Sequence, residues 1–163
     1  MIRILLFTAL FAISLPVYSA DTMHDENLNW FNNNYVQIEN VLAQDADLSL
    51  VPYLNTLIVM WTKRDGAMTG EISPLLAVSL INHPELTLRA FAEHPKSYER
   101  WLTQLQGTLF TDFSGNDHKS LKKLHCDLSS AMENYSQYGD ESLIPLAMNL
   151  LESLKAIEIR VVD

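Results

Sequence analysis

Two His-Pro pairs, eleven residues apart, constrain the fold of this chain more than any other feature of its sequence. They stand at His83-Pro84 and His94-Pro95. Proline is favoured at the first helical position, and it disfavours the α conformation in the residue before it, as an N-cap requires. Each pair therefore predicts a helix start, with short helices over 84–93 and 95–106. By the same reasoning, Val51-Pro52 and Ser73-Pro74 also predict helix starts.

Apolar residues recur at helical spacing in three longer segments. The stripes are Leu28, Phe31, Tyr35, Ile38 and Leu42; Leu121, Leu124, Leu128, Met132 and Tyr135; and Leu143, Leu146, Ala147, Leu150, Leu151, Leu154 and Ile157. Asp25 and Asp117 are the predicted N-caps of the first two helices. The third helix either begins at Pro145 or is kinked there. Residues 53–61 and 75–81 are apolar nearly all round, which is typical of buried central helices.

These patterns predict an all-α fold of about seven mostly short helices packed as antiparallel pairs. Two arrangements stay open: a small stack of the armadillo or HEAT kind, and an irregular orthogonal bundle. Residues 157–162 are the sole candidate strand, and we expect them to fray at the C-terminus. A length of 163 residues suits one domain with a full core.

The first twenty residues have the pattern of a secretory signal peptide. Arg3 precedes a twelve-residue apolar run, Ile4–Leu15, that polar residues interrupt only twice. Small residues follow, so we expect residues 1–19 to be cleaved off after Ser19, or else after Ala20, leaving a single helical domain over 20–163. The apolar run is shorter than the roughly 20 residues that span a bilayer. We therefore expect no membrane insertion after cleavage.

Cysteine usage bears on the compartment. The chain has one cysteine, Cys126, so it cannot form an intramolecular disulfide. An exported domain with a lone cysteine favours the bacterial periplasm, because secreted domains elsewhere usually carry paired cysteines; an extracellular location is the alternative. We expect Cys126 to be a buried, inert thiol beside a half-exposed histidine. The alternatives are a redox-active thiol and an intermolecular disulfide, which leaves the oligomeric state open.

Charge and motifs exclude several function classes. With 11 basic and 20 acidic residues, the net charge of -9 argues against nucleic-acid binding. The sequence contains no nucleophile-elbow, zinc-protease, dinucleotide-binding or phosphate-loop motif. We therefore expect no catalytic residues, no cofactor and no enzymatic activity.

Two stretches deserve comparison with metal sites. His118, His125, Cys126 and Asp127 are clustered, but residues 125 and 126 point about 100° apart on a helix and Lys122 stands between the histidines. Residues 112–117 look like a calcium loop, yet an EF-hand needs Gly and Glu where this chain has Asp117 and Lys123. We expect no metal site, and we expect 112–117 to be a turn that leads into the Asp117 cap.

The acidic residues are concentrated near the N-terminus. From Asp21 to Thr62 there are six acidic residues and no Lys or Arg. Such an unbalanced surface attracts cationic partners. Trp30 lies off the apolar stripe and in line with Asn34 and Gln37, which makes it a candidate interface anchor. The predicted partner-binding residues are Asp25, Glu26, Trp30, Asn34, Gln37 and Glu39. The alternative is that Trp30 packs on a neighbouring helix and the acidic residues aid solubility.

The sequence thus favours an exported, non-enzymatic helical domain that binds another, basic protein. An inhibitor or immunity-type protein acting against a basic periplasmic partner is a specific version of this hypothesis. Two alternatives stay open: an accessory or structural subunit of an envelope complex, and an enzyme whose site is assembled from dispersed carboxylates and histidines.

Overall fold

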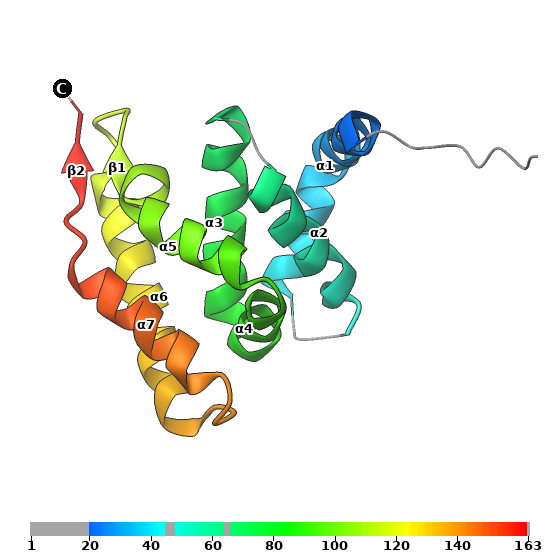
Figure 1. Ribbon diagram of the computed structural model, residues 1–163. Helices are drawn as coiled ribbons and strands as arrows, with labels where there is room; N and C mark the ends of the chain where they lie inside the picture. Colours follow the sequence, from blue (N-terminus) through cyan, green and yellow to red (C-terminus); the bar gives the residue numbers. More distant parts are fainter. Residues whose placement is uncertain (1–19, 45–47, 64–65, 163) are drawn as a thin grey trace, which may run out of the picture.

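The computed structural model describes residues 20–44, 48–63 and 66–162. The predicted signal peptide, residues 1–19, lies outside them. Along the described chain, the elements are α1 (Ala20–Ala43), α2 (Leu50–Lys63), α3 (Gly66–Asn82), α4 (Pro84–Glu93), α5 (Pro95–Leu109), β1 (Thr111–Asp112), α6 (His118–Tyr138), α7 (Ile144–Lys155) and β2 (Arg160–Val161) (Figure 1). The predicted all-α class is confirmed.

Helix α3 occupies the middle of the molecule. Five other helices, α1, α2, α4, α5 and α6, pack against it (Figure 1). Its residues Ile72, Leu76, Ala77 and Leu80 have no exposed surface. A helix that is apolar on most of its circumference is stable only when neighbours cover it, because exposed apolar surface is unfavourable in water. The other helices are therefore arranged around α3.

The two His-Pro helix starts are confirmed. Helices α4 and α5 begin at Pro84 and Pro95, with the preceding histidines at their N-caps. The His83 side chain is buried, and its Nε2 is 3.1 Å from the carbonyl oxygen of Leu42. The Asn82 side-chain amide donates to the same carbonyl at 3.0 Å. The corner between α3 and α4 thus satisfies a carbonyl at the end of α1 that has no partner within its own helix.

Two predicted helix starts are wrong. Pro74 lies inside α3, which begins at Gly66, because the burial of this helix among five others outweighs the local cost of an interior proline. Asp25 lies inside α1, which begins at Ala20, since no glycine or proline stops the helix earlier. The other starts agree with the structure: Asp117 is the N-cap residue of α6, α7 has its proline in the first turn, and α2 begins just before Val51-Pro52.

The C-terminal segment does not fray, which corrects the expectation for residues 157–162. Strand β2 pairs in parallel with β1, so that Thr111 lies opposite Arg160. The backbone N–H of Arg160 donates to the carbonyl of Phe110 at 3.0 Å. The Gln106 side chain also donates to the carbonyl of Glu158 at 2.6 Å. A strand needs a partner, and the sequence does not show that β1, directly after α5, supplies one.

The predicted turn over 112–117 is organised by one buried carboxylate. Asp112 is only 1% exposed, and it accepts hydrogen bonds from the backbone N–H groups of Ser114, Gly115 and Asp117 at 3.0, 2.7 and 2.9 Å. The Ser114 hydroxyl donates to it as well, at 3.0 Å. Burial opposes ionisation, but these hydrogen bonds outweigh it and hold the pKa of Asp112 below its ordinary value of 3.8. Gly115 adopts a φ of 72°, which favours glycine.

We predict that Asp112→Asn lowers stability at neutral pH and much less in acid. Because the pKa of Asp112 is lower in the folded chain than in the unfolded one, its ionised form stabilises the fold fully above about pH 4, and this contribution is lost as the pH falls through the folded-state value. The measurement is the urea midpoint of both proteins from pH 7 down to about pH 2.5, with the exposed Glu133→Gln as control. A gap between the midpoints that stays constant over this range would contradict the prediction.

Candidate protein-binding face

Three of the predicted binding residues lie where α1 meets α2. The Trp30 ring is half-buried, with its centroid 5.9 Å from that of Tyr53 on α2. The Gln37 side-chain amide donates to the hydroxyl of the same tyrosine at 2.9 Å. The Asn34 amide donates to the backbone carbonyl of Trp30 at 2.7 Å. Trp30 and Gln37 thus hold α1 against α2, as the packing alternative for Trp30 anticipated, whereas Asn34 bonds within α1. The role of all three in binding a partner stays a prediction.

The remaining predicted residues are acidic. Glu26 and Glu39 are exposed on α1, whereas the side chain of Asp25 lies outside the described residues. A second carboxylate, that of Glu71, acts on the same tyrosine as Glu39. The pKa of Tyr35 is raised first by burial and then by the negative charges of Glu39 and Glu71. Exposed acidic side chains of α1 and α3 are therefore both near one tyrosine. We call Glu39 and Glu71 the acidic wall.

No cation neutralises the acidic wall within the described ranges. The ion pairs there join Arg89 to Glu85 and Asp140, and Lys123 to Asp127. All of these residues belong to α4, α6 and the turn between α6 and α7. The sequence pattern predicted Glu39 but missed Glu71, because only the packing of α3 on α1 brings Glu71 there.

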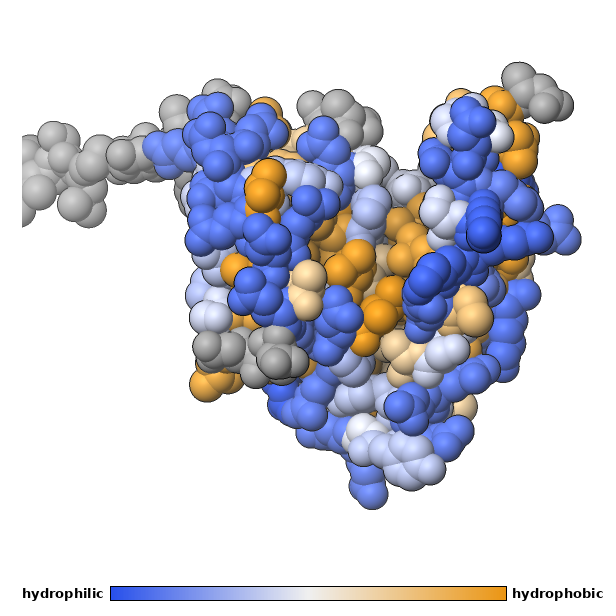
Figure 2. Space-filling view, turned by 180° about the vertical axis from the view of Figure 1, so that it is seen from behind, coloured by the Kyte–Doolittle hydropathy of each residue, from blue (hydrophilic) through white to orange (hydrophobic). Residues whose placement is uncertain are grey.

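An apolar cavity opens between α3, α5 and the start of α6. Its volume is about 500 Å³. It is lined by Thr69, Gly70, Pro74, Gly107, Thr108, Leu109, Thr111, Phe113, Leu121 and Leu124. Figure 2 shows apolar atoms gathered in a hollow near the centre of the rear face, with hydrophilic surface on both sides. The size and lining are typical of sites that bind apolar groups.

A second, smaller cavity of about 260 Å³ lies farther along α3 and α6. It is lined by Ile81 of α3 and by Ala131, Tyr135 and Tyr138 of α6, among others. On α3, Val78 stands between the two cavities and is also half-buried. We call the line of half-buried residues that connects the cavities the apolar seam: Pro74, Val78 and Ile81 of α3 with Leu121, Leu124 and Ala131 of α6.

The acidic wall borders the apolar seam. Residues three or four apart on a helix are neighbours on its surface. Glu71 is therefore adjacent to Pro74, which is in turn adjacent to Val78. One face of the molecule thus carries unneutralised carboxylates next to half-buried apolar side chains.

Two glycines keep the first cavity open. Gly70 and Gly107 lie inside helices α3 and α5 and both line the cavity. A Cβ atom added to either would meet no other atom within 4 Å, so close packing does not require glycine there. Glycine inside a helix is less favourable than alanine by about 1 kcal/mol. At both positions the glycine leaves space open in the cavity, and it makes its helix less stable than alanine would.

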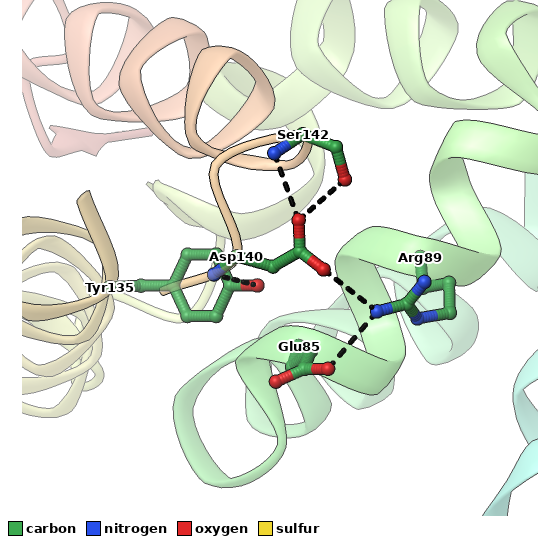
Figure 3. A network of polar contacts seen from close by, with 5 residues as sticks. All are labelled: Glu85, Arg89, Tyr135, Asp140 and Ser142. Carbon is green, nitrogen blue, oxygen red and sulfur yellow. Dashed lines mark hydrogen bonds and ion pairs between the residues drawn. The ribbon is translucent and has the colours of Figure 1, made fainter. Parts of the chain in front are cut away.

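A polar cluster at the other end of α6 is structural. Figure 3 shows Asp140 accepting hydrogen bonds from the N–H and hydroxyl of Ser142, at 2.9 and 2.6 Å, and from Arg89 at 3.2 Å. Arg89 also pairs with Glu85 at 3.1 Å, and the backbone N–H of Asp140 donates to the hydroxyl of Tyr135 at 3.3 Å. The bonds from Ser142, and then Arg89, lower the pKa of Asp140. The cluster fixes the α6–α7 turn against α4.

The cluster around Cys126 differs from the expectation. Cys126 is exposed, so its predicted burial is wrong: the buried face of α6 is made of Leu128, Met132 and Tyr135, and Cys126 points away from it. The neighbouring His125 is half-buried, with Nε2 3.0 Å from the carbonyl of Leu154 on α7. Within the described ranges, no three His, Cys, Asp or Glu side chains are close enough to hold a metal ion.

Comparisons with models of protein families, with curated proteins and with solved structures found no match for this chain. Among the described helices, none combines the length and the hydropathy that crossing a membrane requires.

We predict that Cys126 in the folded protein reacts with a polyethylene-glycol maleimide nearly as fast as it does in the urea-unfolded chain, because its side chain is exposed. The measurement is the time course of the mass shift on a gel in native buffer and in urea. Cys126→Ser, which has no other thiol, is the control. Strong protection in native buffer would contradict the exposed position.

Proposed function

We propose that this protein is an exported, non-enzymatic interaction domain that binds a basic protein. The observation that carries the proposal is the acidic wall, where Glu39 and Glu71 are exposed, both lie near Tyr35, and receive no cationic partner from the described residues. Surface charge of one sign speeds and orients association with a partner of the opposite sign.

The distribution of charge along the sequence supports the proposal. The chain carries 20 acidic and 11 basic residues, and none of the basic ones lies between Asp21 and Thr62. Cleavage of the predicted signal peptide would also remove Arg3, leaving 10 basic residues and a net charge of -10. Residues 21–62 therefore account for -6 of this net charge of -10.

Export determines which basic partners are relevant. The pattern of residues 1–19 indicates export, and the lone Cys126 favours the bacterial periplasm. A small acidic protein there suits the neutralisation of a basic protein that attacks the cell wall or the membrane. An inhibitor or immunity-type protein is the specific form of the proposal. Its contact residues are Glu39 and Glu71, with Glu26 also exposed on α1.

The test compares three immobilised proteins: the wild type, Glu39→Lys/Glu71→Lys, and Glu133→Lys/Glu152→Lys. The last pair carries the same charge change on exposed positions of α6 and α7. Each protein is incubated with envelope extract at low salt and eluted with a salt gradient.

We expect the wild type and the control to retain a basic protein in near-stoichiometric amount and to release it at moderate salt. Glu39→Lys/Glu71→Lys should bind that protein about tenfold or more weakly, because two attractive charges become repulsive. Equal retention by all three proteins, retention that salt does not weaken, or no retained basic protein would each contradict the proposal.

A further inference from the structure

The apolar seam follows α3 and α6 in a defined direction. The first cavity joins Pro74 of α3 to Leu121 near the start of α6, and the second joins Ile81 near the end of α3 to Tyr138 at the end of α6. The two helices therefore run in the same direction along the seam. At 1.5 Å per residue, the seam follows α6 for about 15 Å from Leu121 to Ala131, and the second cavity extends it to Tyr138, about 25 Å from Leu121.

Each end of the seam carries an exposed aromatic side chain. Phe113, before the start of α6, is 73% exposed, and Tyr138, its last residue, is 82% exposed. Aromatic side chains lose little conformational entropy on binding and often dominate the energy of protein interfaces. Half-buried apolar residues between two exposed aromatic ones are typical of a surface that a partner covers.

We infer that the apolar seam binds an amphipathic helix of the basic partner; this inference rests on the proposed function and extends it. The walls of the seam are α3 and α6, whose backbone groups are bonded within each helix and offer no free strand edge to an extended peptide. A helical segment satisfies its own backbone and presents apolar side chains at positions i, i+3 or i+4, and i+7.

The acidic wall specifies the charge of this helix. Glu71 borders the seam on α3 beside Pro74, and Glu39 of α1 acts on the same tyrosine, Tyr35, as Glu71 does. A helix lying in the seam would place the flank of its apolar stripe against these carboxylates. Lys or Arg on that flank would pair with them, whereas acidic residues would be repelled.

The glycine-lined cavity offers a place for one large side chain of the partner helix. Its volume of about 500 Å³ exceeds that of any single side chain, and neither Gly70 nor Gly107 has a Cβ to obstruct it. Helix-in-groove complexes depend on such anchors at helical spacing. Phe113 at the mouth of the cavity would pack against the anchor.

The test uses three synthetic peptides of about 18 residues, which is long enough to span the seam as a helix. The first has Leu at i, i+3, i+4 and i+7 and Lys elsewhere. The second has the same composition in scrambled order, and the third replaces Lys by Glu. Calorimetric titration of the full chain at about 0.15 M salt should show that the first binds at least about tenfold more tightly than the other two.

Variants then locate the site. Gly107→Leu would fill the cavity without a clash at Cβ, so we expect Tm to be unchanged or raised while binding of the amphipathic peptide falls at least tenfold. Phe113→Ser should weaken binding about fivefold, because it removes an exposed anchor. Met148→Ser, which changes an equally apolar residue that is 57% exposed on α7, should have no effect.

The outcomes separate this inference from the proposed function. If the scrambled peptide binds as tightly as the amphipathic one, or if Gly107→Leu binds undiminished, the inference is overturned while the acidic wall keeps its role. If Gly107→Leu abolishes binding but Glu39→Lys/Glu71→Lys leaves it unchanged, the seam is confirmed as the groove and the proposed preference for a basic partner is wrong. If no peptide binds and a twelve-carbon fatty acid fills the cavity instead, the occupant is an acyl chain and the inference is overturned.

Discussion

The need to cover α3 determines where the other helices lie. Its apolar residues surround the helix, and even its serines are buried. Ser73 is bonded to Thr108 at 2.9 Å and accepts a hydrogen bond from the Trp101 indole at 2.9 Å, both from α5. Ser79 is bonded to Thr87 of α4 at 2.7 Å. Since buried hydroxyls need partners, these bonds fix which side of α3 faces each helix.

The neighbouring helices do not cover α3 completely on the side that faces α6. This partly uncovered side links the fold to the proposed function. Pro74, Val78 and Ile81 remain half-buried there, beside cavities that the side chains of α6 do not fill. Interiors are normally packed without such gaps, because unfilled space loses dispersion contacts. Gly70 and Gly107 widen the gap further at positions where alanine would fit. A partner that occupied the seam would complete the cover.

Prolines in the sequence predicted helix starts correctly where the packing of the surrounding helices did not favour a longer helix. Pro84, Pro95 and Pro145 mark helix starts in the structure, but Pro74 has the same local pattern and lies within a helix. The difference is burial, since the surroundings of residues 66–82 stabilise a continuous helix by more than the roughly 3 kcal/mol that a proline costs. No local pattern carries that information.

The candidate site could be predicted only in part for the same reason. The excess of acidic residues near the N-terminus drew attention to Glu39, but Glu71 joins it only through the packing of α3 on α1. Trp30 lies off the apolar stripe of α1, and the structure shows that it packs on Tyr53 of α2. The seam itself requires knowing that α3 and α6 lie side by side.

The most direct measurement of the central claim is an NMR titration of the methyl-labelled full chain with the basic amphipathic peptide. The account predicts that the methyl signals of Val78, Ile81, Leu121 and Leu124 shift together and saturably, because these side chains line the seam. The methyl signal of Met148 on α7, which lines neither cavity of the seam, should stay in place. Shifts that centre on Met148, or saturable binding that leaves the seam methyls unmoved, would contradict the account.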